Sequence, residues 1–383
     1  MDDYPAGPAS PGPRRPPLSV VIPVNNGGRD FERCLRGLRV SSRADFELVV
    51  VDDGSTDGTA ELAGSRGARV LRNPSRLGPA AARNAGALAA TAPWIFFLDA
   101  DVAVHPDAIE RAMSRVEADP GLAGVFGSYD DAPPAPGLVS RFRNLLHHYV
   151  HQSGSFVDDA RPAHTFWTGC GLIRRDVFIE AGGFDPQRYR RPAIEDIELG
   201  YRITRAGHRI LLARDVQATH LKQWTLLDVI RTDIFRRGVP WMLLMKRSRV
   251  VETDLNVSKS QRACVAATGL GLVGAVAATR WPWAVALLPA SLAAIVGWNR
   301  DFYRFLARRR GPAFAVGSTA MHWLYYCCCG ASVVIALAIW HLGPRLAEDP
   351  TAPVVPGRRL DRAGPDAPAA PHPSRRRRRS PSR

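Results

Sequence analysis

Residues 94–98 form an apolar run of strand length, and two acidic residues, Asp99 and Asp101, follow it directly. A run of this kind predicts a buried β-strand that delivers carboxylates to its C-terminal end. In an open α/β sheet, ligands bind at the carboxyl ends of parallel strands, and carboxylates suit Mg²⁺ or Mn²⁺. The pair therefore predicts a site for a metal and a diphosphate. The alternative is that these acids cap a helix that begins near residues 106–107.

Two earlier strands are predicted to end in a similar way. A β-branched run at 18–24 is followed by Asn25, and an apolar run at 46–51 is followed by Asp52 and Asp53. Between these runs the apolar residues have helical spacing, so strand and helix alternate. Repeated β-α-β units with right-handed crossovers predict an α/β fold with a mostly parallel sheet and helices on both faces. The acidic pair is also typical of turn chemistry alone.

Charge is distributed unevenly along the 383 residues. The formal net charge of +15 comes largely from the second half and from a tail that contains the arginine run 375–379. Such an excess of positive charge is compatible with nucleic acid or an anionic membrane surface as a partner. No aromatic platform or recognition module accompanies the tail, so no nucleic acid is expected. The Pro-rich leader 1–17 and the Pro/Arg-rich tail 343–383 are predicted to be disordered, and the leader lacks the apolar segment of a signal peptide.

Several further motifs follow one another in a fixed order. Together they resemble the inverting glycosyltransferases of family 2, which have the GT-A fold, a Rossmann-like fold for nucleotide-diphospho-sugars. The resemblance rests on residues 20–26, 49–59, 78–86, 97–101, 168–175, 182–185 and 195–202. It covers roughly residues 18–225, which are expected to form a catalytic domain that faces the cytosol.

The resemblance implies a role for each motif. Residues that would hold a UDP-, GDP- or dTDP-linked sugar are Pro23, Val24, Asn25, Asp52, Asp53, Arg83, Asp99, Ala100 and Asp101. A divalent cofactor, Mg²⁺ or Mn²⁺, would be bound by Asp101 and His220. The donor sugar and the acceptor would contact Thr168, Gly169, Cys170 and Trp224. The general base that activates the acceptor would be Asp196, with Glu195 beside it.

Each of these residue types also has an ordinary structural role. Arg83 could be solvated, a lone histidine such as His220 is commonly structural, and Glu195 and Asp196 suit the first turn of a helix. Three histidines within 147–151 could place two imidazoles on one helix face. No carboxylate-rich partner accompanies these histidines, so we do not predict a metal site there.

The pattern changes in residues 226–262, where arginines are interleaved with large apolar residues. This arrangement predicts amphipathic helices that lie in the headgroup plane of a membrane.

Residues 263–342 are predicted to form a transmembrane region of about two to three spans. The candidate spans, of which the first two would form a hairpin, are 264–279, 281–298 and 313–342. The GxGxxG pattern at 269–274 lies inside an apolar segment, so it predicts helix packing rather than a nucleotide loop. The Arg-rich loop 300–310 should be cytosolic, whereas three spans would place the basic tail outside. The number of spans and the side of the tail therefore stay open.

A catalytic domain tethered to a multi-pass cell-membrane protein implies an acceptor that resides at the membrane. The resemblance implies metal-assisted, inverting transfer to a polyprenyl phosphate, a lipid or a cell-surface glycan, as in cell-wall or polysaccharide biosynthesis. Processive synthases carry a Gln-x-x-Arg-Trp motif, of which only Trp224 is present here. Transfer of a single sugar is therefore favoured over processive polysaccharide synthesis. A non-catalytic membrane scaffold with a degenerate GT-A domain is the remaining alternative.

Overall fold

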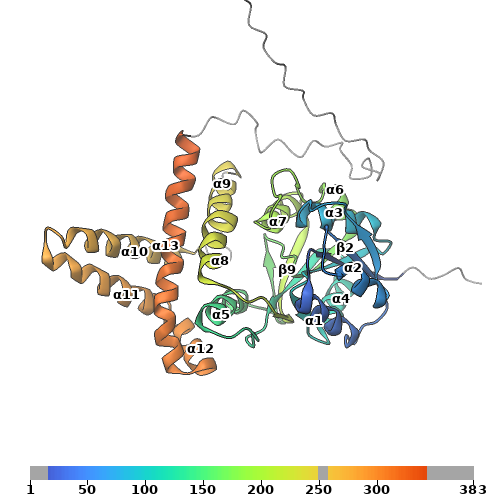
Figure 1. Cartoon of the computed structure of the whole chain (residues 1–383), viewed down its shortest axis with the longest axis horizontal. Coiled ribbons are helices and arrows are strands. Elements are labelled where there is room, and N and C mark those ends of the chain that lie inside the picture. Colours follow the sequence, from blue (N-terminus) through green and yellow to red (C-terminus); the bar gives the residue numbers. More distant parts are fainter. Residues whose placement is uncertain (1–15, 249–257, 343–383) are drawn as a thin grey trace, which may run out of the picture.

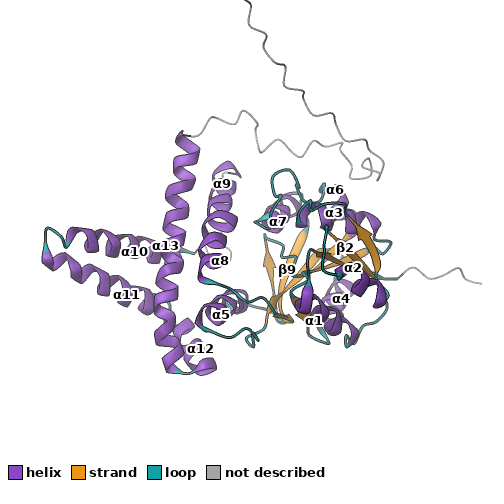
Figure 2. Cartoon of the chain, viewed as in Figure 1, coloured by secondary structure: helices purple, strands orange, loops and turns teal. Residues whose placement is uncertain are grey.

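The computed structural model describes residues 16–248 and 258–342 (Figure 1). Nearly all of the predicted leader and the whole of the Arg-rich tail lie outside the described residues. All strands belong to an N-terminal α/β unit, and the rest of the described chain is helical (Figure 2).

Nine strands form one mixed sheet. Their bounds are β1 Leu18–Val24, β2 Phe46–Asp52, β3 Arg69–Arg72, β4 Trp94–Leu98, β5 Val102–Val104, β6 Leu122–Tyr129, β7 Ala160–Ala163, β8 Cys170–Arg174 and β9 Arg209–His220. Their order is β3-β2-β1-β4-β8-β6-β9-β5, with β7 paired to β9. The block from β3 to β4 is parallel, as predicted. Beyond it, β8 pairs antiparallel to both of its neighbours, and the remaining pairs are of both kinds.

The strand register brings the carboxyl ends of β1, β2 and β4 to one edge of the sheet. Val24 lies opposite Asp52, and Val21 lies opposite Phe97. The residues that follow these strands therefore emerge side by side. In a parallel sheet this edge is the place for a ligand.

Seven helices belong to the α/β unit. Their bounds are α1 Gly28–Arg39, α2 Thr59–Ser65, α3 Pro79–Ala89, α4 Ala108–Ala118, α5 Leu138–Gln152, α6 Arg175–Glu180 and α7 Glu195–Arg205. The N-cap residue of α4 is Asp107. The strand β5 separates it from Asp99 and Asp101, so the alternative interpretation of these two acids as helix caps is wrong.

Three short helical segments connect the α/β unit to the C-terminal helices: α8 Leu226–Arg231, the π-helix η1 Thr232–Gly238 and α9 Val239–Ser248. They lie between the α/β unit and α13, Pro312–Leu342 (Figure 1). The Trp241 indole nitrogen donates to the Tyr201 hydroxyl on α7 at 3.2 Å. Pro240 has no N–H to donate to the preceding turn, which favours the wider π-helical turn before it.

A helical hairpin projects away from the α/β unit (Figure 1). It consists of α10 Lys259–Ala277, the 3₁₀-helix η3 Pro282–Ala286 and α11 Leu287–Trp298. A Cβ atom on Gly271 or Gly274 would collide with Ser291 or Leu287 of α11. These glycines of the GxGxxG pattern therefore let the two helices pack closely.

Only α13, among the described residues, is by itself long and apolar enough to cross a membrane. A second candidate is residues 282–310, in which the chain bends by 78° between α11 and α12, Arg300–Arg310. The basic stretch 300–310 is thus a helix rather than the predicted loop. The separate spans predicted at 264–279 and 281–298 are not supported, because the hairpin helices are too short or too weakly apolar.

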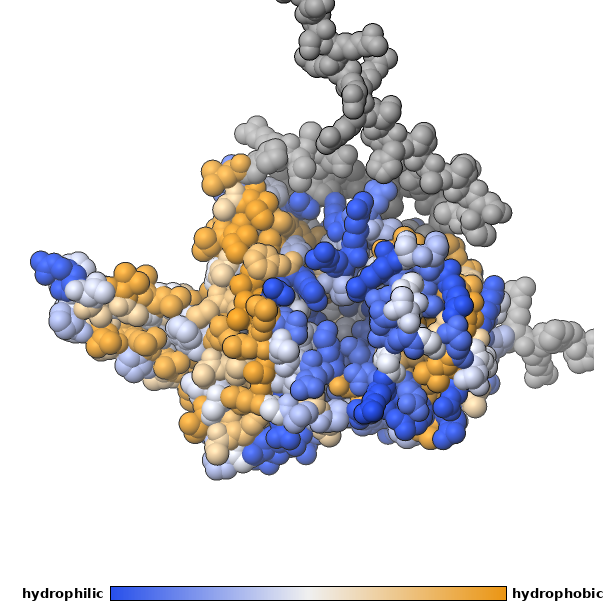
Figure 3. All heavy atoms as spheres, in the orientation of Figure 1, coloured by the Kyte–Doolittle hydropathy of each residue, from blue (hydrophilic) through white to orange (hydrophobic). Residues whose placement is uncertain are grey.

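On the face shown in Figure 3, apolar side chains gather along α13 and in patches on the hairpin. Those with large exposed area are Leu270, Leu272, Val273, Val276, Trp281, Trp283, Val285, Leu287, Trp298, Val316, Val334, Leu337, Ile339, Trp340 and Leu342. An apolar surface of this kind marks a site of contact with a membrane or a protein.

Candidate active site

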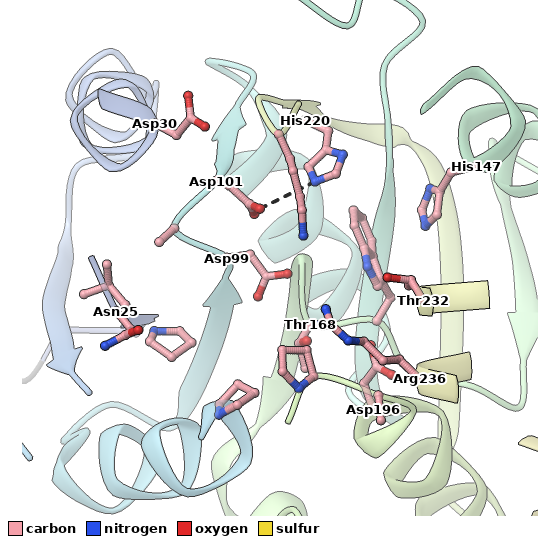
Figure 4. Close-up of a pocket in the computed structure, with 18 of the residues that line it drawn as sticks. Asn25, Asp30, Asp99, Asp101, His147, Thr168, Asp196, His220, Thr232 and Arg236 are labelled. Carbon is pink, nitrogen blue, oxygen red and sulfur yellow. Dashed lines mark ion pairs between the residues drawn. The ribbon is translucent and has the colours of Figure 1, made fainter. Parts of the chain in front are cut away.

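A cavity of about 560 Å³ lies where β1 and β4 end, and η1 closes its opposite wall (Figure 4). The predicted site residues that line it are Pro23, Val24, Asn25, Arg83, Asp99, Ala100, Asp101, Thr168, Glu195, Asp196, His220 and Trp224. The volume is that of an ordinary small-ligand site. Most of the predicted residues thus come together around one space.

Asp101 and His220 face each other in this cavity. The antiparallel pairing of β5 with β9 sets Val102 opposite His220. His220 Nε2 consequently lies 3.7 Å from Asp101 Oδ2 (Figure 4). His220 Nδ1 lies 2.6 Å from the Asn144 amide oxygen, which can only accept, so Nδ1 carries a hydrogen. The other ring nitrogen, Nε2, is therefore the one that faces Asp101.

Asp101 and His220 fit a site for a divalent metal at which a diphosphate supplies further ligands. Within the described residues, no group of three or more His, Cys, Asp or Glu side chains could hold an ion. Mg²⁺ is commonly held by one or two protein side chains, with substrate phosphates and water completing its shell. Burial opposes ionisation of Asp101, yet its interactions with His220 and Lys222 keep the pKa of this carboxyl below the ordinary value. Asp101 is therefore an anionic ligand at neutral pH.

Arg83 has a structural role, and its predicted contact with the nucleotide stays a prediction. Its side chain is buried and donates to Asp99 Oδ1 at 2.6 Å and to Glu195 Oε1 at 3.0 Å. Burial opposes the charge of Arg83, but the two carboxylates raise its pKa. Glu195 also accepts from the backbone N–H of Ala193 at 2.8 Å. Arg83 and Glu195 thus join α3 to the start of α7, and Glu195 is occupied by these bonds rather than available as a base.

Replacing Arg83 by glutamine is expected to destabilise the α/β unit. The change leaves buried Glu195 without its partner, and the loss of one member of a buried ion pair costs about 3–5 kcal/mol. Thermal and urea unfolding, monitored by circular dichroism, would measure the loss in the free energy of unfolding. The control is Arg174→Gln, which breaks a largely exposed pair with Asp176 and should cost less than about 1 kcal/mol. Equal effects of the two changes would contradict the structural role of Arg83.

Asp196 is the acid of α7 that remains available to a ligand. It lines the cavity, and its only side-chain hydrogen bond within the described residues is accepted from the backbone N–H of Ile197 at 2.8 Å. Burial and the neighbouring Glu195 carboxylate raise the pKa of Asp196 to about 7. A carboxyl with such a pKa exchanges protons readily at neutral pH, as a general base must.

Asp52 and Asp53, predicted to hold the donor, lie outside the cavity lining. Asp52 accepts from the backbone N–H of Ser55 at 2.9 Å, and Asp53 accepts from that of Gly78 at 2.8 Å. Gly78 has a φ of +97°, and a Cβ there would collide with the carbonyl of Arg190. The two acids thus shape the turns beside the cavity, and a direct role in donor binding stays a prediction.

The predicted sugar-contacting residues divide between the cavity and its support. Thr168 and Trp224 line the cavity, whereas Cys170 is fully buried in β8. A Cβ on Gly169 would collide with the ring of Trp167, which itself lines the cavity. Gly169 is therefore required for the placement of this ring.

Four basic residues of the cavity were not predicted from the sequence: Arg143 from α5, Lys222 after β9, and Arg236 and Arg237 from η1. The last two belong to the stretch predicted to lie among lipid headgroups, but both line the cavity. The interfacial placement of the other residues of this stretch stays a prediction. The π-helical turn shifts these side chains relative to a regular helix. No local pattern in the sequence indicates such a turn, apart from Pro240.

The histidines of α5 are held mainly by the fold. Nδ1 of His148 lies 2.7 Å from the carbonyl of Tyr129, and Nδ1 of His151 lies 3.2 Å from that of Gly127. His147 lines the cavity, and burial together with the neighbouring His151 lowers its pKa well below the ordinary value. His147 is therefore neutral at physiological pH.

Comparison with a solved structure identifies the class of fold. The mannosyltransferase PcManGT from Pyrobaculum calidifontis, in complex with GDP-Man and Mn²⁺, matches with a TM-score of 0.51 and 19% identity. The match covers 85% of this chain and 88% of that chain. The α/β unit thus has the GT-A fold.

Sequence comparisons give the family. The family described as "Glycosyl transferase family 2" matches residues 19–182. Glycosyltransferase AglE of Haloferax volcanii is 28% identical over 54% of this chain and 67% of its own length. Validoxylamine A glucosyltransferase of Streptomyces hygroscopicus subsp. jinggangensis is 32% identical over 54% of this chain and 56% of its own length. Residues 19–182 of the α/β unit thus match a glycosyltransferase family 2 domain.

The matched segment spans only about half to two thirds of the length of these curated relatives. A pre-mycofactocin glycosyltransferase of Mycobacterium tuberculosis is 31% identical over 58% of this chain and 48% of its own length. These matches thus cover a part of each relative, and among the named families only residues 19–182 are assigned.

Proposed function

We propose that the protein transfers one sugar from a nucleoside diphosphate donor to a hydroxyl group of a membrane-associated acceptor, with inversion at the anomeric carbon. The observation that carries this proposal is the placement of Asp101, His220 and Asp196 around one cavity at the carboxyl edge of the sheet (Figure 4). The first two can hold the diphosphate through a divalent ion. The third can take the acceptor proton.

The donor diphosphate would lie between the two walls of the cavity. Asp101 and His220 would bind Mg²⁺ or Mn²⁺, which when bound offsets the negative charge that develops on the leaving diphosphate. Lys222, two residues after His220, and Arg236 of η1 line the same space and add positive charge. Asn25, which follows β1 and lines the cavity, would contact the nucleoside.

Asp196 would act as the general base. The acceptor hydroxyl oxygen attacks the anomeric carbon on the side opposite the diphosphate, and a new C–O bond forms. The bond from that carbon to the diphosphate oxygen breaks, and its electron pair leaves with the nucleoside diphosphate. The hydroxyl proton passes to the Asp196 carboxylate.

The helical part would attach the enzyme to the membrane. The exposed apolar residues of the hairpin and α13 support contact with lipid (Figure 3). Trp281 and Trp283, both exposed between α10 and α11, suit an interface. Anchoring through α13, with a cytoplasmic catalytic domain, is a part of this proposal. The processive alternative is less favoured, because the Gln-x-x-Arg motif is absent before Trp224.

Calorimetric titration of the detergent-purified protein with UDP, GDP and dTDP, each with and without Mn²⁺, tests the proposal. Metal-dependent binding of one nucleoside diphosphate is expected, and it would also identify the base. No binding to any of the three would overturn the proposal in favour of a non-catalytic scaffold with a degenerate GT-A domain.

A further inference from the structure

A second cavity, of about 480 Å³, lies between α9, α10 and α13. Apolar side chains dominate its lining, among them Trp241, Met242, Met245, Val265, Tyr325 and Val333. Two polar residues of this lining already have interaction partners within the protein. Gln261 accepts from the Tyr326 hydroxyl at 2.8 Å, and the Lys246 ammonium lies 5.6 Å from the Trp340 ring centroid. The second cavity is therefore suited to an apolar chain.

Two arginines line both cavities. Arg143 of α5 and Arg237 of η1 belong to the wall of the catalytic cavity and to that of the second cavity. Arg143 pairs with Asp233 at 2.6 Å. Arg237 forms no ion pair within residues 16–248 and 258–342, the part that the structure describes. The boundary between the cavities thus carries an excess of positive charge.

The fold holds Arg237 at this boundary. The next residue, Gly238, lies so close to α13 that a Cβ would collide with the hydroxyl of Ser332. Burial and the neighbouring Arg143 lower the pKa of Arg237, while Asp233 and Asp196 act in the opposite direction. Arg237 is thus near Asp196, in surroundings that a bound anion would stabilise.

We propose that the acceptor is a lipid with a phosphate in its head group, whose apolar chain occupies the second cavity and whose phosphate binds Arg143 and Arg237. A hydroxyl group beyond the phosphate then reaches Asp196. This assignment rests on the proposed sugar transfer, and it explains why an apolar cavity and a charged cavity meet at two arginines. The surrounding apolar surface of α10 and α13 provides a route from a membrane.

Short-chain probes test the assignment without knowledge of the natural acceptor. Decyl phosphate and citronellyl phosphate, a straight and a branched chain, would be titrated calorimetrically into the full-length protein in maltoside detergent, alongside inorganic phosphate. At least one alkyl phosphate should bind at least ~10-fold more tightly than inorganic phosphate, because it buries its chain. The preferred chain would indicate an acyl or an isoprenoid lipid.

Two neighbouring residues of α13 give a matched pair of variants. Val333 lines the second cavity, whereas Val334 is exposed on the outer face. Val333→Trp fills the cavity and should weaken alkyl phosphate binding at least ~10-fold, while Val334→Trp should leave it unchanged. Arg237→Gln should also weaken binding by ~10-fold or more, through loss of a charge-assisted hydrogen bond.

Nucleoside diphosphate binding to the same variants separates the two proposals. Val333→Trp should retain it, since this residue lies outside the catalytic cavity. Equal affinity for alkyl and inorganic phosphate, or equal losses in Val333→Trp and Val334→Trp, would overturn the lipid assignment. Alkyl phosphate binding without any nucleoside diphosphate binding would instead overturn the proposed sugar transfer.

Discussion

Replacing Asp101 by alanine should abolish metal-dependent binding of the nucleoside diphosphate and, with it, sugar transfer. Asp101 is the only carboxylate in contact with His220 within the described residues, so its removal leaves the metal with one protein ligand. The fold should persist, because the bond from Leu221 N–H to residue 101 uses the backbone carbonyl. Calorimetry with and without Mn²⁺, together with turnover of the nucleotide sugar, would measure the effect.

Asp107→Ala is the matched control for this change. Asp107 is a half-exposed aspartate six positions further along the chain, and it pairs with Arg111 outside the cavity. The control should retain metal-dependent binding and turnover. Full activity of Asp101→Ala would show that the metal assignment is wrong.

Asp196→Asn should reduce turnover by at least ~100-fold with donor affinity retained, as the loss of a general base does. The amide keeps the shape of the side chain but cannot accept the proton. Since the pKa of Asp196 is raised to about 7, the carboxyl is largely protonated below that pH and inactive as a base. The rate of the unmodified enzyme should therefore rise with pH through about 7 and level off above it.

The pH profile distinguishes a base from a binding residue. The pH profile of Asp196→Asn should lack the inflection near pH 7, and its turnover should be reduced. Asp176→Asn, which changes an exposed aspartate at the start of α6, should retain both. A variant at Asp196 that only weakens donor binding, with kcat and pH profile intact, would move this residue to a binding role.

The early strands and helices could be predicted because local patterns specify them. The runs that became β1, β2 and β4 are continuous and apolar, as buried parallel strands require. The polar residues that follow β1 and β4, Asn25 and Asp101, line the cavity because parallel strands end at one edge of a sheet. The order of the family motifs further identified the fold and the general chemistry.

The helical part shows where local pattern is insufficient. An amphipathic stretch with arginines is equally consistent with lipid headgroups and with a charged cavity in the protein. Only the tertiary structure shows that Arg236 and Arg237 of η1 line the cavity. Likewise, apolar composition alone did not separate a hairpin of short helices from membrane spans.

The sequence by itself thus determined the GT-A unit and the acids at its ligand-binding edge, through periodicity and strand ends. Tertiary structure alone decided the partners of those acids. Arg83 meets Glu195 across 112 positions, and His220 meets Asp101 through the register of β5 with β9. Likewise, Arg143 of α5 and Arg237 of η1 come together in the lining of both cavities. Such contacts depend on long-range packing, which no local propensity specifies.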